Sequence, residues 1–133
     1  LPVLFGSDDS WYAKPDAGSM IVSPADVSPC KPHDAWANEE DIARGIYNFE
    51  MMMEPKVTKL TSNWAGLRSF APDQSLVIGP DSESPNFFWL AGQGGYGFQT
   101  CLAASQIAED ILFNHTPQVS TSLSEKFSPH RFT

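Results

Sequence analysis

Short apolar runs separated by turn-forming residues mark the beginning of the chain. The run at 1–5 is ended by a polar turn that begins at Gly6, and a second run starts at Trp11. Residues 15–18 read Pro-Asp-Ala-Gly, in which Pro presets one turn angle and Gly supplies a positive one. The pattern predicts strands over 1–5, 11–14 and 19–23, the last two joined as a hairpin, and then a proline-rich loop over 24–37.

The apolar positions take up a helical spacing after Asn38. This residue can cap a helix, and the three acidic residues that follow it suit the positive end of a helix dipole. The sequence therefore predicts a helix that starts at Asn38 and stops at Pro55. Its apolar positions lie three or four residues apart: Ile42, Ile46, Phe49 and Met53.

The remaining apolar stretches predict three further strands and a second helix. We expect strands over 57–67 and 76–78, and a strongly apolar strand over 87–91 that is buried on both faces. A helix is predicted over 102–113, and from residue 114 onward the polar, Ser/Thr-rich sequence predicts a loose tail. The apolar stripe of that second helix consists of Ala104, Ile107, Ala108 and Ile111.

Composition and charge narrow the possible classes of function. The 133 residues are 41% hydrophobic with nine Phe and four Trp, which is enough to bury a core. The net charge of −8 and the lack of Lys/Arg clusters argue against a nucleic-acid partner. We see no membrane span and no signal-peptide pattern, and we expect a cytoplasmic protein. The His residues show no metal-ligand spacing, so no metal site is predicted, and Cys30 and Cys101 are expected to be reduced and buried.

The most informative segment is a glycine-rich run over 92–100. Gly92, Gly94 and Gly97 form G-x-G-x-x-G between a predicted strand and a predicted helix. The second strand and the ribose-binding acid of a dinucleotide fingerprint are missing, and no P-loop lysine follows. Glycines and the helix amino terminus would still suit a flat group that becomes negative during reaction. The alternative is a tight strand-to-helix turn that binds no ligand.

Arg68 and Tyr12 are candidate substrate-binding residues. Arg68 ends an apolar stretch in a chain with only eight basic residues, and a guanidinium there can hold a carboxylate through two hydrogen bonds. The hydroxyl of Tyr12 could donate to the same carboxylate. A structural ion pair for Arg68 and an ordinary half-buried strand position for Tyr12 remain the alternatives.

Two segments together resemble a known family. The sequence SNWAGLRSFAPDQSLVIGPD, followed by NFFWLAGQGGYGFQTCLAASQIAEDIL, is similar to the carboxy-terminal half of D-amino-acid oxidase-like flavoproteins, which include D-amino-acid dehydrogenases and glycine and sarcosine oxidases. The upstream WYAKPDAGSMIVSPADVSP also resembles the D-arginine dehydrogenase type. The resemblance covers roughly residues 10 to 112.

The resemblance implies an α+β fold that is incomplete relative to the full family fold. Residues 1–70 would form part of the antiparallel, sheet-plus-helix substrate-binding region. Residues 71–113 would return to the FAD-binding domain with its terminal strand and helix, and 114–133 would be a flexible tail. The amino-terminal half, which carries the phosphate-binding fingerprint for FAD in the family, would have to be supplied separately.

The resemblance also implies roles for individual residues. Arg68 would bind the substrate carboxylate with help from Tyr12, while Gly95 and Gln99 would line both substrate and flavin. Hydride would pass from the amino-acid α-carbon to flavin N5, and water would hydrolyse the resulting imino acid. No catalytic side chain is assigned. The segment that would face the flavin ring of FAD comprises Gly92, Gly94, Gly95, Tyr96, Gly97, Phe98, Gln99 and Thr100.

On these grounds we expect the chain to be part of an FAD-dependent oxidoreductase that oxidises an amino acid, and more specifically a D-amino acid. We expect the chain alone to be inactive and to need the amino-terminal half or a partner subunit. Apolar surface meant for that half could also cause self-association. The rival hypothesis is a non-catalytic module that binds a partner protein or a small carboxylate. Neither the substrate nor the electron acceptor, oxygen or quinone, can be identified from the sequence.

Overall fold

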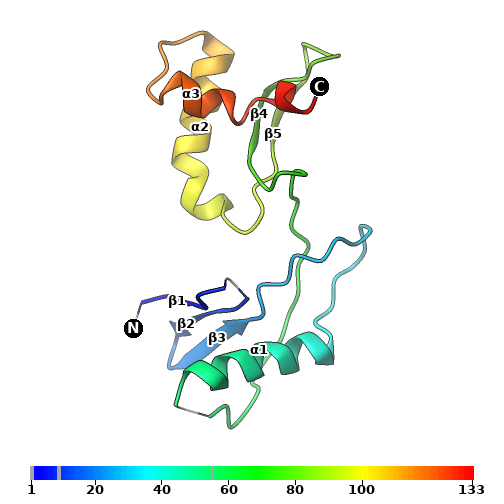
Figure 1. Ribbon diagram of the computed structural model, residues 1–133, viewed down its shortest axis with the longest axis vertical. Coiled ribbons are helices and arrows are strands. Elements are labelled where there is room, and N and C mark those ends of the chain that lie inside the picture. The colour runs from blue at the N-terminus through cyan, green and yellow to red at the C-terminus, as the bar shows by residue number, and fades with distance from the viewer. Residues whose placement is uncertain (1, 9, 55) are drawn as a thin grey trace. The chain divides into compact units, whose positions relative to one another are not determined.

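The computed structural model describes residues 2–8, 10–54 and 56–133, and the chain divides into two compact units, Leu1–Leu67 and Arg68–Thr133. In these described residues the strands form a three-stranded and a two-stranded sheet, both antiparallel, accompanied by helices (Figure 1). The α+β class predicted from the sequence is therefore confirmed. Each unit is described by itself below.

Unit 1 is built on the predicted hairpin. Strand β1 (Leu4–Phe5) pairs with β2 (Tyr12–Asp16), and β2 pairs with β3 (Ser19–Ser23), all antiparallel. The turn between β2 and β3 places Ala17 at φ 44° and Gly18 at φ 82°. Two successive positive φ angles match the twist of a hairpin, and Gly adopts such an angle without steric cost.

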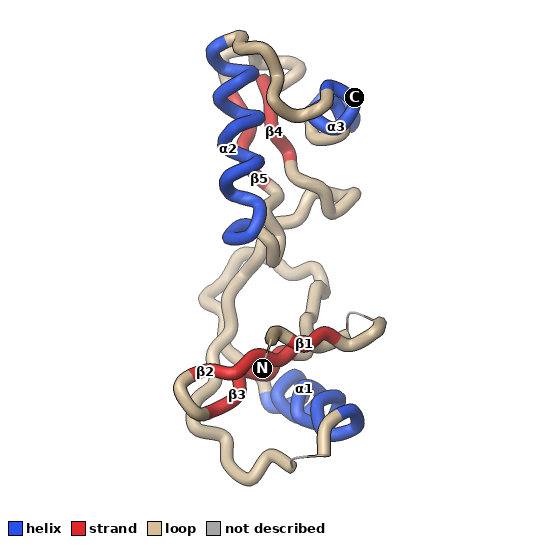
Figure 2. The backbone as a smooth tube through the Cα atoms, turned by 90° about the vertical axis from the view of Figure 1, so that its left-hand side faces the viewer, coloured by secondary structure: helices blue, strands red, loops and turns tan. Residues whose placement is uncertain are grey.

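Helix α1 (Glu39–Met52) covers this sheet (Figure 2). Its start is fixed by Asn38, whose side chain accepts a hydrogen bond of 2.8 Å from the backbone N–H of Asp41. Phe49 is buried and packs edge-on against Trp11, with ring centroids 6.0 Å apart. The buried centre of the unit consists of Trp11, Ala13 and Phe49. The predicted start of the helix after Asn38 is thus confirmed. The helix ends at Met52, and Pro55, where it was predicted to stop, lies outside the described residues.

The segment 57–67 forms no strand, which corrects the sequence-based prediction. Its backbone pairs with neither β1 nor β3, and the side chains of Leu60, Trp64 and Leu67 are exposed. Apolar content alone predicted a strand here. Without a partner edge an extended segment cannot form the ladder of hydrogen bonds that defines a strand.

Unit 2 combines a hairpin with a long helix. Strand β4 (Val77–Pro80) pairs antiparallel with β5 (Phe88–Ala91), and Ile78 lies opposite Leu90. Helix α2 (Gly97–Phe113) begins five residues before the predicted helix and packs its small residues on β4. No helix in the described part of the chain is long and apolar enough to cross a membrane. The core cluster of this unit is Ile78, Ala104, Ile107 and Ala108.

Strand β5 is not buried on both faces, contrary to the prediction. Trp89 is 38% exposed and Leu90 is 50% exposed. The sheet has only two strands, so β5 is an edge strand, and the α2 side chains of the core cluster pack around Ile78 of β4. Cys30 and Cys101, which were expected to be buried, are free and exposed.

The carboxy-terminal residues form regular structure where the sequence predicted a loose tail. They contain helix α3 (Thr121–Glu125) and the 3-10 helix η1 (Pro129–Phe132). Val119 and Phe127 pack against the core cluster of unit 2, and the carbonyl of Phe127 accepts a hydrogen bond of 2.8 Å from Ile78 N–H. Helices this short have no recognisable hydrophobic period and are marginal in isolation, and here the residues that flank α3 are the ones packed against the core of the unit.

Candidate functional site

The glycine-rich run is a tight bend between β5 and α2. Gly92 and Gly94 adopt φ angles of 71° and 55°, which side-chain-bearing residues rarely take. The N–H of Gly94 donates to the carbonyl of Ser69 at 2.9 Å. A methyl group on Gly94 would lie 2.6 Å from Cε1 of Phe70, so conformation and space both require glycine.

Arg68 lies beside the next glycine. A methyl group on Gly95 would be 3.0 Å from Nη1 of Arg68, and the Arg68 guanidinium carbon is 5.3 Å from the ring centroid of Phe70. Residues 68–70 therefore run along the glycine-rich run and bring a cation to it. Two residues that the sequence singled out separately, Arg68 and Gly95, are brought together by the fold of unit 2.

The amino terminus of α2 closes the run. Tyr96 is the N-cap residue but makes no capping hydrogen bond through its side chain, and the first turn contains no acidic residue. The first backbone N–H groups of a helix have no acceptor within the helix and carry partial positive charge. This end of α2 is thus electrostatically suited to a neutral or anionic acceptor group.

The predicted cofactor-facing residues at the start of α2 lie on different surfaces. Phe98 is 98% exposed, while Gln99 and Thr100 line a shallow hollow of about 220 Å³ beside the run. Thr100 also donates its side-chain hydroxyl to the Tyr96 carbonyl at 2.8 Å, which tightens the first turn. The other residues that line the hollow are Gln74, Ser75, Leu76, Gly92, Gln93, Tyr96 and Phe127.

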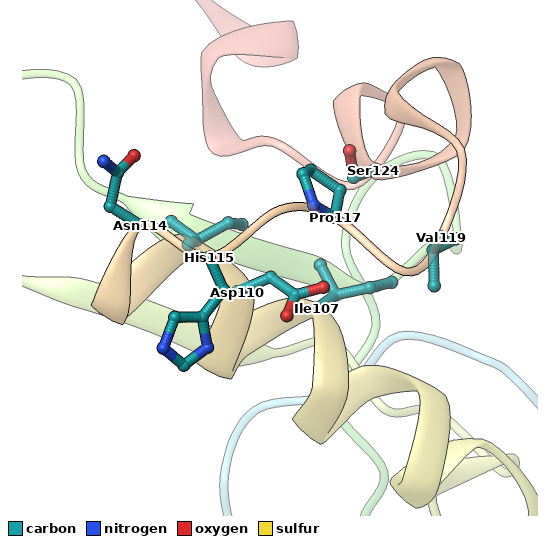
Figure 3. Close-up of a pocket in the computed structure, with 8 residues that line it drawn as sticks. Ile107, Asp110, Asn114, His115, Pro117, Val119 and Ser124 are labelled. Atoms are coloured by element: carbon teal, nitrogen blue, oxygen red, sulfur yellow. The ribbon is translucent and has the colours of Figure 1, made fainter.

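A larger hollow of about 340 Å³ lies at the opposite end of α2 (Figure 3). It is lined by residues such as Ile107, Asp110 and His115, and it contains no residue that the sequence predicted for the site. Asp110 is buried, and its carboxylate accepts hydrogen bonds from the Gln106 side chain and the Gln118 N–H, both at 3.0 Å. Since that carboxylate is satisfied by the protein, the hollow near the glycine-rich run is the better functional candidate.

Tyr12 belongs to unit 1. It lies on β2 opposite Ser23, is half-buried, and its ring centroid is 6.1 Å from that of Phe5. Arg68 belongs to unit 2, so the joint action of the two residues on one carboxylate stays a prediction.

Sequence reasoning missed two supports of the glycine-rich run. Phe70 packs on Gly94, and Asp73 forms an ion pair with Arg131, with Nε 2.7 Å from Oδ2. The hydrogen bond from Arg131 holds the pKa of Asp73 at about 2, below its ordinary value of 3.8. Phe70 directly follows the Arg68 motif and could have been suspected. Nothing in the sequence pattern links Asp73 to a residue near the carboxy terminus.

Residues 1–111 match the sequence model of a protein family described as FAD dependent oxidoreductase (DAO). The matched segment contains β1 to β5 and most of α2, together with Tyr12, Arg68 and the whole glycine-rich run. It ends before α3 and η1.

Proposed function

The chain belongs to the DAO family of FAD-dependent oxidoreductases, and we propose that it forms the part of such an enzyme that holds an amino-acid substrate, specifically a D-amino acid, against the flavin ring. The observation that carries this proposal is the position of the Arg68 guanidinium beside Gly95. It puts a cation for a carboxylate next to a backbone segment that a flat ring can approach closely.

Arg68 would orient the substrate. A guanidinium can hold both oxygens of a carboxylate at once, which fixes the direction of the bond between the carboxylate and the α-carbon. Because positioning of a reacting carbon accounts for a large part of rate enhancement, Arg68 would contribute through orientation and would exchange no proton. Tyr12 is proposed to donate a hydrogen bond to the same carboxylate.

The glycine-rich run would hold the flavin ring. When bound, FAD supplies the acceptor of the hydride released from the amino-acid α-carbon. The residues present fit such a group: Gly92 and Gly94 shape the bend, the backbone of Gly95 is exposed beside Arg68, and α2 presents an amino terminus without an acidic residue in its first turn. The positive end of the helix dipole favours negative charge on a ring placed there. Gly95, Tyr96, Gly97, Phe98, Gln99 and Thr100 complete the proposed flavin-facing segment.

The phosphates of FAD would be held elsewhere. The glycine-rich run lacks the second strand and the acidic residue of a dinucleotide fingerprint, so we propose that the amino-terminal half of the enzyme, or a partner subunit, supplies the phosphate site. The 133-residue protein purified by itself should then show no visible flavin absorbance band. A stoichiometric yellow flavin in this chain alone would contradict that division of roles.

The decisive experiment compares two substrates in the flavin-bound enzyme. Arg68→Ala should raise KM for a D-amino acid by an amount equivalent to roughly 2–4 kcal/mol, as expected when one partner of a charged pair is removed. The matching amine without a carboxylate should be oxidised equally by both forms. Lys59→Ala, which removes an exposed cation of unit 1, is the control. Equal losses with both substrates, or no loss, would remove Arg68 from the carboxylate site.

A further inference from the structure

We propose that residues 117–132 form a C-terminal clasp that positions the glycine-rich run through the turn before β4, with Arg131 as the positioning residue. The clasp lies beyond residue 111, the last residue of the family match. Its effect on loop geometry does not depend on flavin binding. Its consequence for the cofactor rests on the proposed function.

The clasp is first fixed to helix α2. The buried carboxylate of Asp110 accepts the backbone N–H of Gln118 at 3.0 Å. Val119 then packs against the core cluster that includes Ile107. The chain after α2 is thereby turned back along the helix toward the hairpin.

The clasp next covers strand β4. The Ile78 N–H donates to the Phe127 carbonyl at 2.8 Å, so this backbone group of β4 is satisfied by the clasp. Gly79, at φ 143°, lies so close to Pro129 that a methyl group would be 3.0 Å from the Pro129 Cδ. The close approach of Pro129 to Gly79 fixes how near η1 packs to strand β4.

Arg131 then binds the turn that precedes β4. Its Nε and Nη2 donate to the two carboxylate oxygens of Asp73 at 2.7 and 3.0 Å, and Nη2 also donates to the Ser75 carbonyl at 3.3 Å. Nη1 donates to the Ser128 carbonyl at 3.0 Å, which holds the guanidinium in place from its own side. The Arg131 side chain is only 16% exposed, whereas the Asp73 side chain is 41% exposed, so the arginine is held by the protein while its carboxylate partner stays open to solvent.

The turn held by Arg131 supports the glycine-rich run directly. A methyl group on Gly92 would lie 3.2 Å from the Ser75 carbonyl oxygen and 3.6 Å from the Ala71 nitrogen. The Gln74 N–H donates to the Ala71 carbonyl at 2.9 Å and closes the turn. Gly92, the first residue of the run, therefore rests on backbone whose position is fixed through Asp73 and Ser75.

The hollow of about 220 Å³ is lined by residues of the clasp, of the turn before β4 and of the glycine-rich run. Phe127 comes from the clasp, Gln74 and Ser75 come from the turn, and Gly92, Tyr96 and Gln99 come from the run and the start of α2. Three segments distant in sequence thus build its walls. Movement of the clasp would change both the shape of the hollow and the backbone angles of the run.

The test is residue-resolved amide hydrogen exchange of the 133-residue protein, read by NMR. Arg131→Ala should speed exchange of the Gly94 N–H, which bonds to Ser69, by about tenfold or more, because local opening becomes easier. Amides of Ala104 to Ala108 in α2 should change by less than about threefold. Arg131→Lys, which keeps the charge without the two-pronged contact, should restore only part of the protection.

A second variant separates positioning from simple loss of stability. Asp73→Asn keeps the shape of the side chain and weakens the ion pair, and it should reproduce the local effect at Gly94. Lys126→Ala, which removes an exposed cation of the clasp, should leave the exchange rate of the Gly94 N–H unchanged. Unchanged Gly94 exchange in both Arg131→Ala and Asp73→Asn would overturn the proposal, and so would uniform acceleration across unit 2. Failure of the Arg68 substrate experiment would leave this result untouched.

Discussion

The guanidinium of Arg68 lies against Gly95, so that a methyl group on this glycine would be 3.0 Å from Nη1. The obstacle is the end of a flexible side chain, which can move aside at little cost. Gly95 adopts no positive φ angle, so alanine is not strained there. An alanine at this position would therefore displace Arg68 while leaving the fold in place.

Gly95→Ala should impair catalysis without unfolding the protein. We expect the free energy of unfolding to stay within about 0.5 kcal/mol of the original. In the flavin-bound enzyme, kcat/KM for an amino acid should fall about ten- to hundredfold, since small displacements of a positioning group are costly. Urea denaturation and steady-state kinetics provide the two readouts.

A matched control for this substitution is Gly66→Ala. Among the described residues, apart from Gly66 and its two chain neighbours, no heavy atom lies within 4 Å of a methyl group placed on Gly66. Its kinetics should equal those of the original enzyme. If Gly95→Ala also behaved like the original, the Arg68 guanidinium would not act from its observed position.

Gly94→Ala should have the opposite profile, with a large loss of stability. Its φ of 55° costs a side-chain-bearing residue about 1–2 kcal/mol, and the close contact with the Phe70 ring adds strain. From these two effects together we expect the free energy of unfolding of unit 2 to fall by about 2–4 kcal/mol. Fluorine NMR of fluorotryptophan-labelled protein can follow this unit through Trp89 during denaturation. A loss no larger than that of Gly66→Ala would contradict the observed backbone conformation.

The ion pair between Asp73 and Arg131 predicts a specific dependence on pH. The pKa of Asp73 is lowered from 3.8 to about 2, mainly by the hydrogen bond from Arg131 and further by the Ser75 N–H. A lowered pKa in the folded state means that the stabilisation is complete above pH 3.8 and is lost as the pH falls toward 2. Carboxyl-carbon NMR titration should find the low value, and Arg131→Ala should return it toward 3.8. An unchanged pKa in this variant would exclude the contact.

Asn38→Ala should weaken unit 1 through helix α1. The Asn38 side chain accepts the Asp41 N–H at 2.8 Å, and loss of such a cap costs about 1 kcal/mol. Thermal unfolding of unit 1, followed by the Trp11 signal of fluorotryptophan-labelled protein, measures the loss. Asn63→Ala removes an exposed loop amide and should have little effect. Equal stability of the two variants would show that the cap contributes nothing.

Local signals predicted the elements that short-range chemistry dictates. The turn at 15–18 and the Asn38 cap act within a few residues, so the hairpin β2–β3 and helix α1 could be recognised. The segment 57–67 and strand β5 could not be judged in this way. A strand needs a partner edge and burial needs a covering layer, and neither is encoded in the apolar residues themselves.

The sequence by itself determined the α+β class, the DAO family resemblance and the candidate residues Arg68 and Gly95. Only the tertiary structure decided that these two residues touch, that Gly94 rests on Phe70, and that Arg131 grips Asp73 across 58 positions of sequence. The physical reason is that periodicity and turn chemistry act over a few residues, whereas such contacts depend on how the backbone of unit 2 folds back on itself.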